Sequence, residues 1–273
     1  MKVPIYVVDA FTDRRFRGNP AAVCWLDAWL PDELLQAIAA ENRHSETAFC
    51  VSAAGDRGER ADEEPADADY ELRWFTPVAE VGLCGHATLA AAHVLFRELR
   101  PGTRRVRFRT RRSGLLTVEE EGDLLWMDLP AWPPAPAEPP AALVSALGRA
   151  PLEVWASEDW LAVYGSEDEV RELRPDLGRL ATVGRRGVIV TAPGTDTDLV
   201  SRFFAPALGV PEDPVTGSAH CTLAPYWARR LGRTRLTARQ VSARGGELVC
   251  EDRGDRVRIG GRAALYLRGT IEV

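Results

Sequence analysis

Two stretches of this sequence repeat one another and decide its fold. The first is RWFTPVAEVGLCGHATLAAAHVLF (73–96), and the second is RFFAPALGVPEDPVTGSAHCTLAPYWA (202–228), which has three extra residues between Pro206 and Glu212. Both copies read as a strand, a proline corner, a glutamate, then Cys or Thr before Gly, and an Ala/Leu-rich helix. A shared order of this length indicates an internal duplication. We therefore predict two pseudo-symmetric halves that face each other.

Strands and helices are also expected outside the repeat. Alternating β-branched and aromatic residues predict strands, and apolar residues at helical spacing predict helices. The predicted strands are 3–11, 21–26, 44–51, 70–77, 106–110, 114–122, 124–130, 160–165, 187–192, 201–206, 247–252 and 257–261. The predicted helices are 32–43, 85–99, 142–149, 166–175 and 218–231.

Proline and charge mark the segments between the halves and on the surface. The stretch PAWPPAPAEPP (130–140) is predicted to lack regular structure and to link the domains, because proline removes amide donors. The first domain is then 1–129, completed by a C-terminal strand at 262–273, and the second is 141–261. The charged stretch 55–69 has no apolar periodicity and is predicted to be a surface loop.

Length and charge narrow the class of protein. The chain has 273 residues, 45% of them hydrophobic, which is enough for two cores. No stretch approaches the ~20 apolar residues of a membrane span, and no secretory signal begins the chain, so we predict a cytoplasmic protein that does not bind membranes. The net charge of −6 disfavours nucleic acid as a partner. The arginine run at 104–112 reads as one solvated strand face.

Several cofactor chemistries are excluded by residue usage. Lys2 is the only lysine and lies at the terminus, which excludes Schiff-base chemistry. The five cysteines are odd in number, widely spaced and set in apolar runs, unlike those of a disulfide framework or a zinc ribbon. We therefore predict reduced thiols. Four histidines without a metal-binding motif, and the lack of a phosphate-binding glycine loop, argue against metal and nucleotide sites. We therefore expect no metal and no cofactor.

A glycine precedes the predicted helix in each copy of the repeat. Gly85 stands before HATLAAAHVLF and Gly217 before SAHCTLAPYWA. Helix starts gather unpaired amides and the positive end of the helix dipole, so they favour a carboxylate. The alternative is a tight turn without function. Two such starts directed into one cleft predict a small carboxylic acid as substrate.

At this point the sequence resembles the phenazine-biosynthesis isomerase-like family. The residues that carry the resemblance occur in the right order over nearly the whole chain: DAFTDRRFRGNPAAV (9–23), RHSETAF (43–49), LCGHATLA (83–90) and EDPVTGSAH (212–220). The resemblance implies the diaminopimelate epimerase fold, an α+β architecture in which each half is a mixed sheet curled around a central helix. It also implies a site between the halves and a homodimer.

The resemblance assigns roles to individual residues. The proton-shuttling carboxylate falls on Glu46, with His86 and Asp213 as further catalytic residues. Substrate-binding positions fall on the residues Asn19, Cys84, Gly85, Thr216, Gly217 and Ser218. A carboxylic acid in a closed, partly apolar cleft has a pKa raised toward neutrality and can give and take a proton. These assignments predict an isomerase that moves a proton on a small polar acid.

Structural alternatives exist for the residues assigned to catalysis. Glu46 could cap a surface turn, His86 could be a buried core histidine, and Asp213, which precedes proline, could only shape a turn. The histidines at 44, 93 and 220 are expected to have no part in the chemistry.

Two other functions stay open. Related epimerases use a thiolate in each half, but here the equivalent pair is Cys84 and Thr216, and a threonine hydroxyl is too weak an acid to be the second base. An epimerase or racemase would therefore use Cys84 with Glu46 or His86. The third possibility is a ligand-binding protein that has kept the fold without activity.

Overall fold

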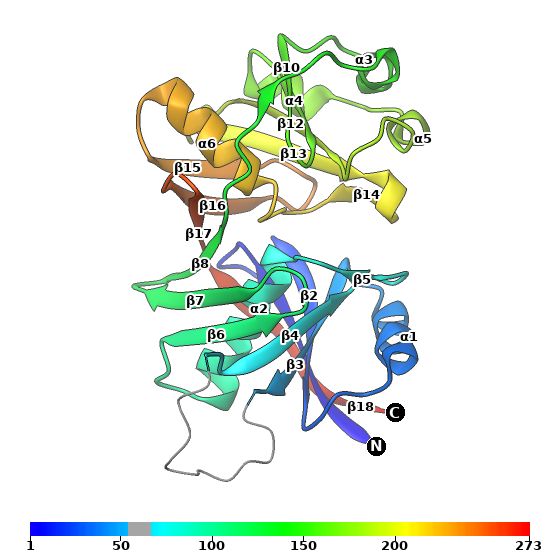
Figure 1. Cartoon of the computed structure of the whole chain (residues 1–273), viewed down its shortest axis with the longest axis vertical. Coiled ribbons are helices and arrows are strands. Elements are labelled where there is room, and N and C mark those ends of the chain that lie inside the picture. Colours follow the sequence, from blue (N-terminus) through cyan, green and yellow to red (C-terminus); the bar gives the residue numbers. More distant parts are fainter. Residues whose placement is uncertain (54–66) are drawn as a thin grey trace. The chain divides into compact units, whose positions relative to one another are not determined.

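The computed structural model describes residues 1–53 and 67–273, and the chain divides into two compact units. Unit 1 comprises Met1–Arg15, Pro20–Asp128 and Gly261–Val273, and unit 2 comprises Phe16–Asn19 and Leu129–Gly260 (Figure 1). Each unit is described by itself below. The surface loop predicted at 55–69 falls, up to residue 66, outside the described residues.

Unit 1 is built on a mixed sheet. Its strands follow the order β18-β1-β2-β3-β4-β6-β7-β8, and β5 pairs with the other end of β4. The β2–β3 and β4–β6 pairs are parallel, whereas β3–β4, β6–β7 and β7–β8 are antiparallel. The bounds are β1 Lys2–Ala10, β2 Asn19–Leu26, β3 Glu46–Ser52, β4 Tyr70–Phe75, β5 Glu80–Val81, β6 Arg105–Thr110, β7 Leu115–Glu121, β8 Leu124–Pro130 and β18 Ala263–Glu272.

Helix α2 (Gly85–Val94) forms the core of unit 1. Every residue from Gly85 to Ala92 is buried, so the helix has no solvent face, as its all-round apolar sequence requires. It packs on β1, β3 and β18, and its alanines allow the strands to approach closely. The helix continues as one π-helical turn at Leu95–Leu99. Helix α1 (Asp32–Asn42) packs on β3 and β4 at the outside of the sheet.

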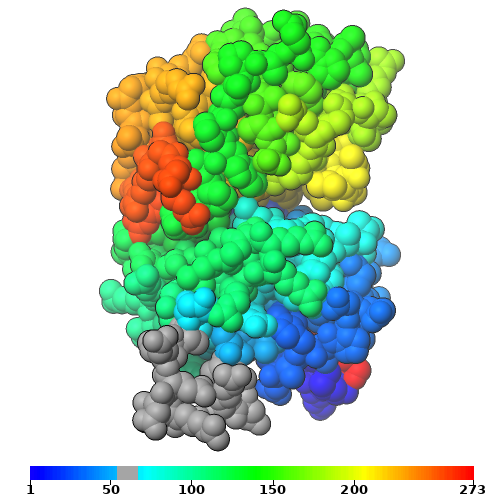
Figure 2. Space-filling view, in the orientation of Figure 1, coloured from blue at the N-terminus to red at the C-terminus, as the bar shows by residue number. Residues whose placement is uncertain are grey.

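The two ends of the chain meet in unit 1. Strand β18 runs antiparallel to β1 over almost its whole length, and the Val273 amide donates to the Met1 carbonyl at 2.8 Å. Figure 2 shows the last and first residues side by side at the lower right.

Unit 2 has the same internal order of strands. The β11–β12 and β13–β15 pairs are parallel, and β12–β13, β15–β16 and β16–β17 are antiparallel, as in the equivalent pairs of unit 1. The β10–β11 pair is antiparallel as well. The strand bounds are β9 Ala135–Pro136, β10 Glu153–Ala156, β11 Trp160–Val163, β12 Val188–Pro193, β13 Leu199–Ala205, β14 Val210–Asp213, β15 Arg235–Gln240, β16 Gly246–Asp252 and β17 Arg256–Gly261. The helices are α3 Ala141–Leu147, α4 Glu167–Glu172, α5 Leu177–Leu180, α6 His220–Leu231 and a 3₁₀ turn at Pro206–Leu208.

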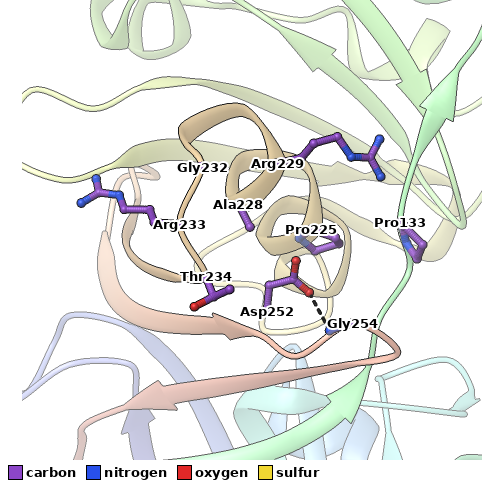
Figure 3. A pocket seen from close by; sticks show the side chains of 9 residues that line it. All are labelled: Pro133, Pro225, Ala228, Arg229, Gly232, Arg233, Thr234, Asp252 and Gly254. Carbon is purple, nitrogen blue, oxygen red and sulfur yellow. Dashed lines mark hydrogen bonds between the residues drawn. The ribbon is translucent and has the colours of Figure 1, made fainter.

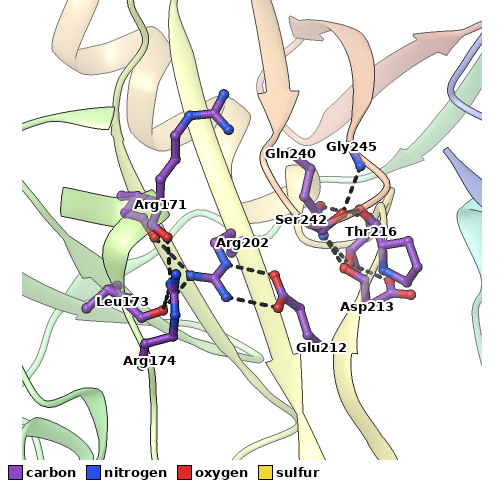
Figure 4. A network of polar contacts seen from close by, with 12 residues as sticks. Arg171, Leu173, Arg174, Arg202, Glu212, Asp213, Thr216, Gln240, Ser242 and Gly245 are labelled. Carbon is purple, nitrogen blue, oxygen red and sulfur yellow. Dashed lines mark hydrogen bonds and ion pairs between the residues drawn. The ribbon is translucent and has the colours of Figure 1, made fainter. Parts of the chain in front are cut away.

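An arginine–glutamate pair recurs in both units at the same place in the repeat. Arg73 on β4 donates Nε and Nη2 to the two carboxylate oxygens of Glu80 at 2.7 and 2.9 Å. Arg202 on β13 donates to Glu212 in the same way and at the same two distances (Figure 4). The predicted duplication is therefore present in side-chain contacts as well as in strand order. The α+β prediction is confirmed, since each unit combines a mixed sheet with a buried helix.

Three expectations about local structure were wrong. The proline-rich stretch at 130–140 contains β9, whose Ala135 and Pro136 pair with Ala156 and Trp155 of β10. Proline is tolerated there because an edge strand leaves one row of amides without a strand partner. Helix α6 begins at His220, and residues 217–219 form a turn in place of the predicted helical start. Strands β5, β9, β10, β14 and β15 were not predicted.

Pro225 leaves one backbone carbonyl of α6 without its helical donor, and the segment after β8 supplies that donor. This residue lies inside the helix and has no amide proton to give to the Cys221 carbonyl. The Trp132 amide donates to that carbonyl at 2.9 Å. The backbone group that proline leaves open is thus satisfied by the neighbouring segment. Among the described residues, no helix has the length and apolar character needed to cross a membrane.

Candidate active site

Unit 1 gathers three of the predicted site residues. Glu46 is the first residue of β3, Cys84 is the N-cap of α2, and His86 lies in the first turn of that helix. The Glu46 Oε2 atom lies 3.3 Å from His86 Nε2, and the Cys84 Sγ atom lies 3.4 Å from His86 Nδ1. The imidazole therefore sits between a thiol and a carboxylate.

The start of α2 holds this arrangement rigidly. Cys84 has an extended backbone, and its carbonyl accepts from the Thr88 amide at 3.1 Å and from the Thr88 hydroxyl at 2.6 Å. Only 16% of the Glu46 side chain and 4% of the His86 side chain are exposed. Gly85 is the first residue of the helix, as the sequence predicted, and its part in substrate binding stays a prediction.

Burial keeps His86 neutral. Removal from water lowers the pKa of His86 from 6.5 to about 3, and the nearby charge of His44 acts in the same direction. A neutral imidazole carries one proton, so one ring nitrogen donates and the other accepts. Since a carboxylate only accepts and a thiol can donate, the arrangement that satisfies both neighbours places the proton on Nε2.

Glu46, Cys84 and His86 each offer an atom that can bind a metal ion, and these three atoms lie within 4.8 Å of one another. However, the Cys84 thiol faces one ring nitrogen of His86 and the Glu46 carboxylate faces the other. A single ion binds one nitrogen of an imidazole and gathers its other ligands on that side. The geometry therefore suits proton relay across the ring better than a mononuclear metal site.

Unit 2 gathers Asn19, Asp213 and Thr216 into a second cluster. Asp213 ends β14, and its carboxylate accepts from Asn19 Nδ2 at 2.7 Å and from the Thr216 hydroxyl at 2.5 Å. Gln240 completes the cluster: its side chain donates to the Asp213 carbonyl at 2.7 Å and accepts from the Thr216 amide at 2.9 Å (Figure 4). All four side chains are buried.

Burial raises the pKa of Asp213 from 3.8 to about 6, although hydrogen bonds from Thr216 and Asn19 oppose the shift. The folded protein therefore holds this proton more tightly than the unfolded chain does. The resulting stabilisation is fully present below pH 3.8 and is lost as the pH rises through about 6.

An Asp213→Asn variant has no proton to titrate there. We expect the free energy of unfolding of the wild type, minus that of the variant, to decrease as the pH rises from 4 to 6, measured by urea denaturation. A difference that stays constant over this range would refute the shift.

Ser218 and Gly217 lie in the turn before α6. The Ser218 hydroxyl accepts from Arg186 Nη1 at 2.7 Å, and Arg186 is also paired with the fully buried Asp159. The Gly217 carbonyl accepts from the His220 amide at 3.0 Å, so this turn leads directly into the helix. Neither Arg186 nor Asp159 was predicted from the sequence.

Burial also keeps two further histidines neutral. His220 occupies the place of Thr88 in the repeat, and its Nδ1 donates to the Thr216 carbonyl at 2.8 Å just as the Thr88 hydroxyl donates to Cys84. Burial lowers the pKa of His220 and that of His93 to about 4, which keeps both neutral.

A pocket of about 460 Å³ in unit 2 lies apart from these residues (Figure 3). It opens at the C-terminal end of α6, and the arginines at 229 and 233 point away from each other at its edges. None of the predicted site residues lines it. The residues that do are Pro133, Pro225, Ala228, Arg229, Gly232, Arg233, Thr234, Asp252 and Gly254.

The sequence resemblance is confirmed by comparison with known proteins. Residues 8–269 match the phenazine biosynthesis-like protein family, and the chain belongs to this family. A Pseudomonas aeruginosa protein named as an uncharacterized isomerase is 54% identical over 273 residues, covering all of both chains. The human phenazine biosynthesis-like domain-containing protein is 40% identical over 292 residues, covering 99% of each.

Solved structures show the same fold. The crystal structure of a PhzF-family protein from Enterococcus faecalis has a TM-score of 0.90 and 42% identity over all of both chains. A hydroxyproline epimerase from Agrobacterium vitis has a TM-score of 0.61 at 10% identity, covering 99% of this chain and 92% of its own. The epimerase fold expected from the sequence is thus confirmed.

Proposed function

We propose that this protein is an isomerase that moves a proton on a small polar carboxylic acid, with Glu46 as the acid/base. The contact between Glu46 and the neutral His86, at 3.3 Å in a largely buried setting, carries the proposal. Relatives named as isomerases and neighbours named as epimerases support a reaction of this type. The substrate class, the cytoplasmic location and the homodimer remain predictions.

In the proposed reaction, the ionised Glu46 removes a proton from carbon, exchanges it with solvent while protonated, and delivers a proton to another carbon. The His86 Nε2 proton stabilises the carboxylate before the transfer and releases it when Glu46 becomes protonated. The two oxygens of one carboxyl group can serve both steps, so no cofactor takes part. Asp213 is the second proposed catalytic residue, since a pKa raised to about 6 lets it take up and release a proton close to neutral pH.

Solvent exchange with a panel of candidate acids tests this function. The wild-type protein is incubated in D₂O with small chiral and unsaturated carboxylic acids, including trans-4-hydroxy-L-proline and diaminopimelate, and with their amides. We expect deuterium on carbon in at least one acid and in none of the amides. Binding without exchange across the panel would favour a silent ligand-binding protein instead.

The rival function is an epimerase in which Cys84 is the base, and its thiol does lie 3.4 Å from the His86 ring. A thiolate would accept a proton from Nδ1, whereas a neutral thiol would donate to Nδ1 and leave the ring proton on Nε2. The two mechanisms therefore differ in the tautomer of His86.

Nitrogen-15 NMR of histidine-labelled protein reads this tautomer directly, with the His86 signals assigned from a His86→Gln variant. We expect the proton on Nε2 in the wild type and in Cys84→Ser, since a serine hydroxyl also donates. Cys84→Ala should also keep the proton on Nε2, because the Glu46 carboxylate still lies beside that nitrogen and can only accept. A proton on Nδ1 in the wild type would support the thiolate and contradict our assignment.

A further inference from the structure

The start of β12 in unit 2 is the counterpart of the start of β3, where Glu46 lies. Glu46 directly precedes the residue that pairs with Phe75, and Gly187 directly precedes the residue that pairs with Phe204. Since Phe75 and Phe204 are equivalent in the repeat, Gly187 occupies the place of the proposed acid/base. Unit 2 therefore has no side chain at this position.

Packing excludes any side chain there. A Cβ atom added to Gly187 would lie 2.4 Å from the Phe203 ring and 2.9 Å from the Phe204 carbonyl oxygen. Both distances are shorter than real contacts allow, and the carbonyl belongs to the backbone of β13. The side chain that reaches the start of α6 comes instead from the preceding residue, Arg186.

Arg186 is held by an acid, a hydroxyl and two aromatic rings. Its Nε and Nη2 atoms donate to the two oxygens of Asp159 at 2.9 and 2.5 Å, and its Nη1 donates to the Ser218 hydroxyl at 2.7 Å. The guanidinium carbon also lies 5.2 Å from the Trp132 ring and 5.3 Å from the Phe203 ring. A planar group fixed by a bidentate carboxylate and two rings has little freedom to turn.

The contact with Ser218 matches the contact of Glu46 in unit 1. His86 is the second residue after Cys84, and Ser218 is the second residue after the equivalent Thr216. Each unit therefore directs one side chain from a strand start to the same position at the start of its helix. The carboxylate of unit 1 is replaced in unit 2 by a guanidinium.

We propose that Arg186 is a positioning residue that makes Ser218 a hydrogen-bond donor for the carboxylate of the substrate. Because the Ser218 oxygen already accepts from Arg186, the hydroxyl proton is directed elsewhere and is available to an anion. The positive charge of Arg186 favours the same ligand, and Asp159 keeps the guanidinium in place. This inference rests on the proposed function in one respect, that the ligand is a carboxylic acid.

Thermal unfolding with acetate as the probe tests the inference. Potassium acetate is titrated at constant ionic strength against potassium chloride, with acetamide as the uncharged control. We expect a saturable rise in the melting temperature of the wild type with acetate alone. Arg186→Gln should weaken the apparent acetate affinity at least about tenfold, the loss expected for a hydrogen bond to a charged group. The matched control is Arg185→Gln, which removes the same charge one residue earlier and should respond as the wild type does.

Arg186→Gln leaves the buried Asp159 without its cation and could prevent folding, so a second variant is needed. Ser218→Ala keeps the Arg186–Asp159 pair and should weaken acetate binding by a similar factor. An unchanged acetate response in either variant, or no response in the wild type, would overturn the inference. Failure of the proposed function is distinguishable: Glu46→Gln should lose exchange of the substrate proton but keep the acetate response.

Discussion

Replacing Arg73 by methionine is expected to lower the free energy of unfolding by about 3–5 kcal/mol, the cost of breaking a buried ion pair on one side. Only 2% of the Arg73 side chain is exposed, and it donates to Glu80 through two atoms and to Asp32 through a third. Its hydrogen bonds to Glu80 lower the pKa of that carboxyl. Without Arg73, the largely buried carboxylate of Glu80 keeps its charge and loses its two short hydrogen bonds, and Arg111 remains beside it at 3.5 Å.

Arg111 provides the matched control for this substitution. It approaches the same two acids at 3.5 Å, but 54% of its side chain is exposed. Arg111→Met should therefore cost less than about 1 kcal/mol. Urea denaturation of both variants measures the two costs. Equal losses would show that the repeated arginine–glutamate pair does not stabilise the strand and proline corner on which each site is built.

Replacing Glu46 by glutamine is expected to lower solvent exchange on the substrate by about 100- to 10,000-fold, the usual contribution of a positioned general acid or base. Glutamine keeps the size and hydrogen-bonding capacity of the side chain but cannot take a proton from carbon. The melting temperature should change little, because 16% of the side chain is exposed and the substitution removes no packing. Exchange rates are measured by NMR or mass spectrometry in D₂O.

The control for this variant is Glu41→Gln, which removes an exposed carboxylate at the end of α1. It should exchange as fast as the wild type. A rate for Glu46→Gln within a few-fold of Glu41→Gln would remove Glu46 from the mechanism.

The repeat was the most informative feature of the sequence. Laying Arg73 over Arg202 and Glu80 over Glu212 aligned residues that the structure pairs with the same geometry in each unit. The apolar run at the end of the first copy of the repeat also located α2, because a run of this length is typical of a buried helix and too long for an ordinary strand. The short strands β5 and β14 could not be found in this way, since two to four residues carry too little periodicity.

The unit 2 site shows the limits of sequence reasoning. Gln240 lies 24 residues from Thr216, and Arg186 lies 27 residues from Asp159 and 32 from Ser218. No local pattern connects such residues, because their contacts depend on how the strands pair. The signal that could have identified Arg186 was its place directly before Gly187, the counterpart of Glu46 at the start of β3. That equivalence requires the pairing register, which only the structure supplies.

The central claim is that the carboxyl of residue 46, and not the thiol of residue 84, exchanges protons with the substrate. Solvent deuterium incorporation measured side by side in Glu46→Gln and Cys84→Ser tests it most directly. We predict that Glu46→Gln loses incorporation while Cys84→Ser stays within about tenfold of the wild type, since a hydroxyl can replace the thiol as a donor. Incorporation that survives in Glu46→Gln and disappears in Cys84→Ser would contradict the claim and assign the chemistry to the thiol.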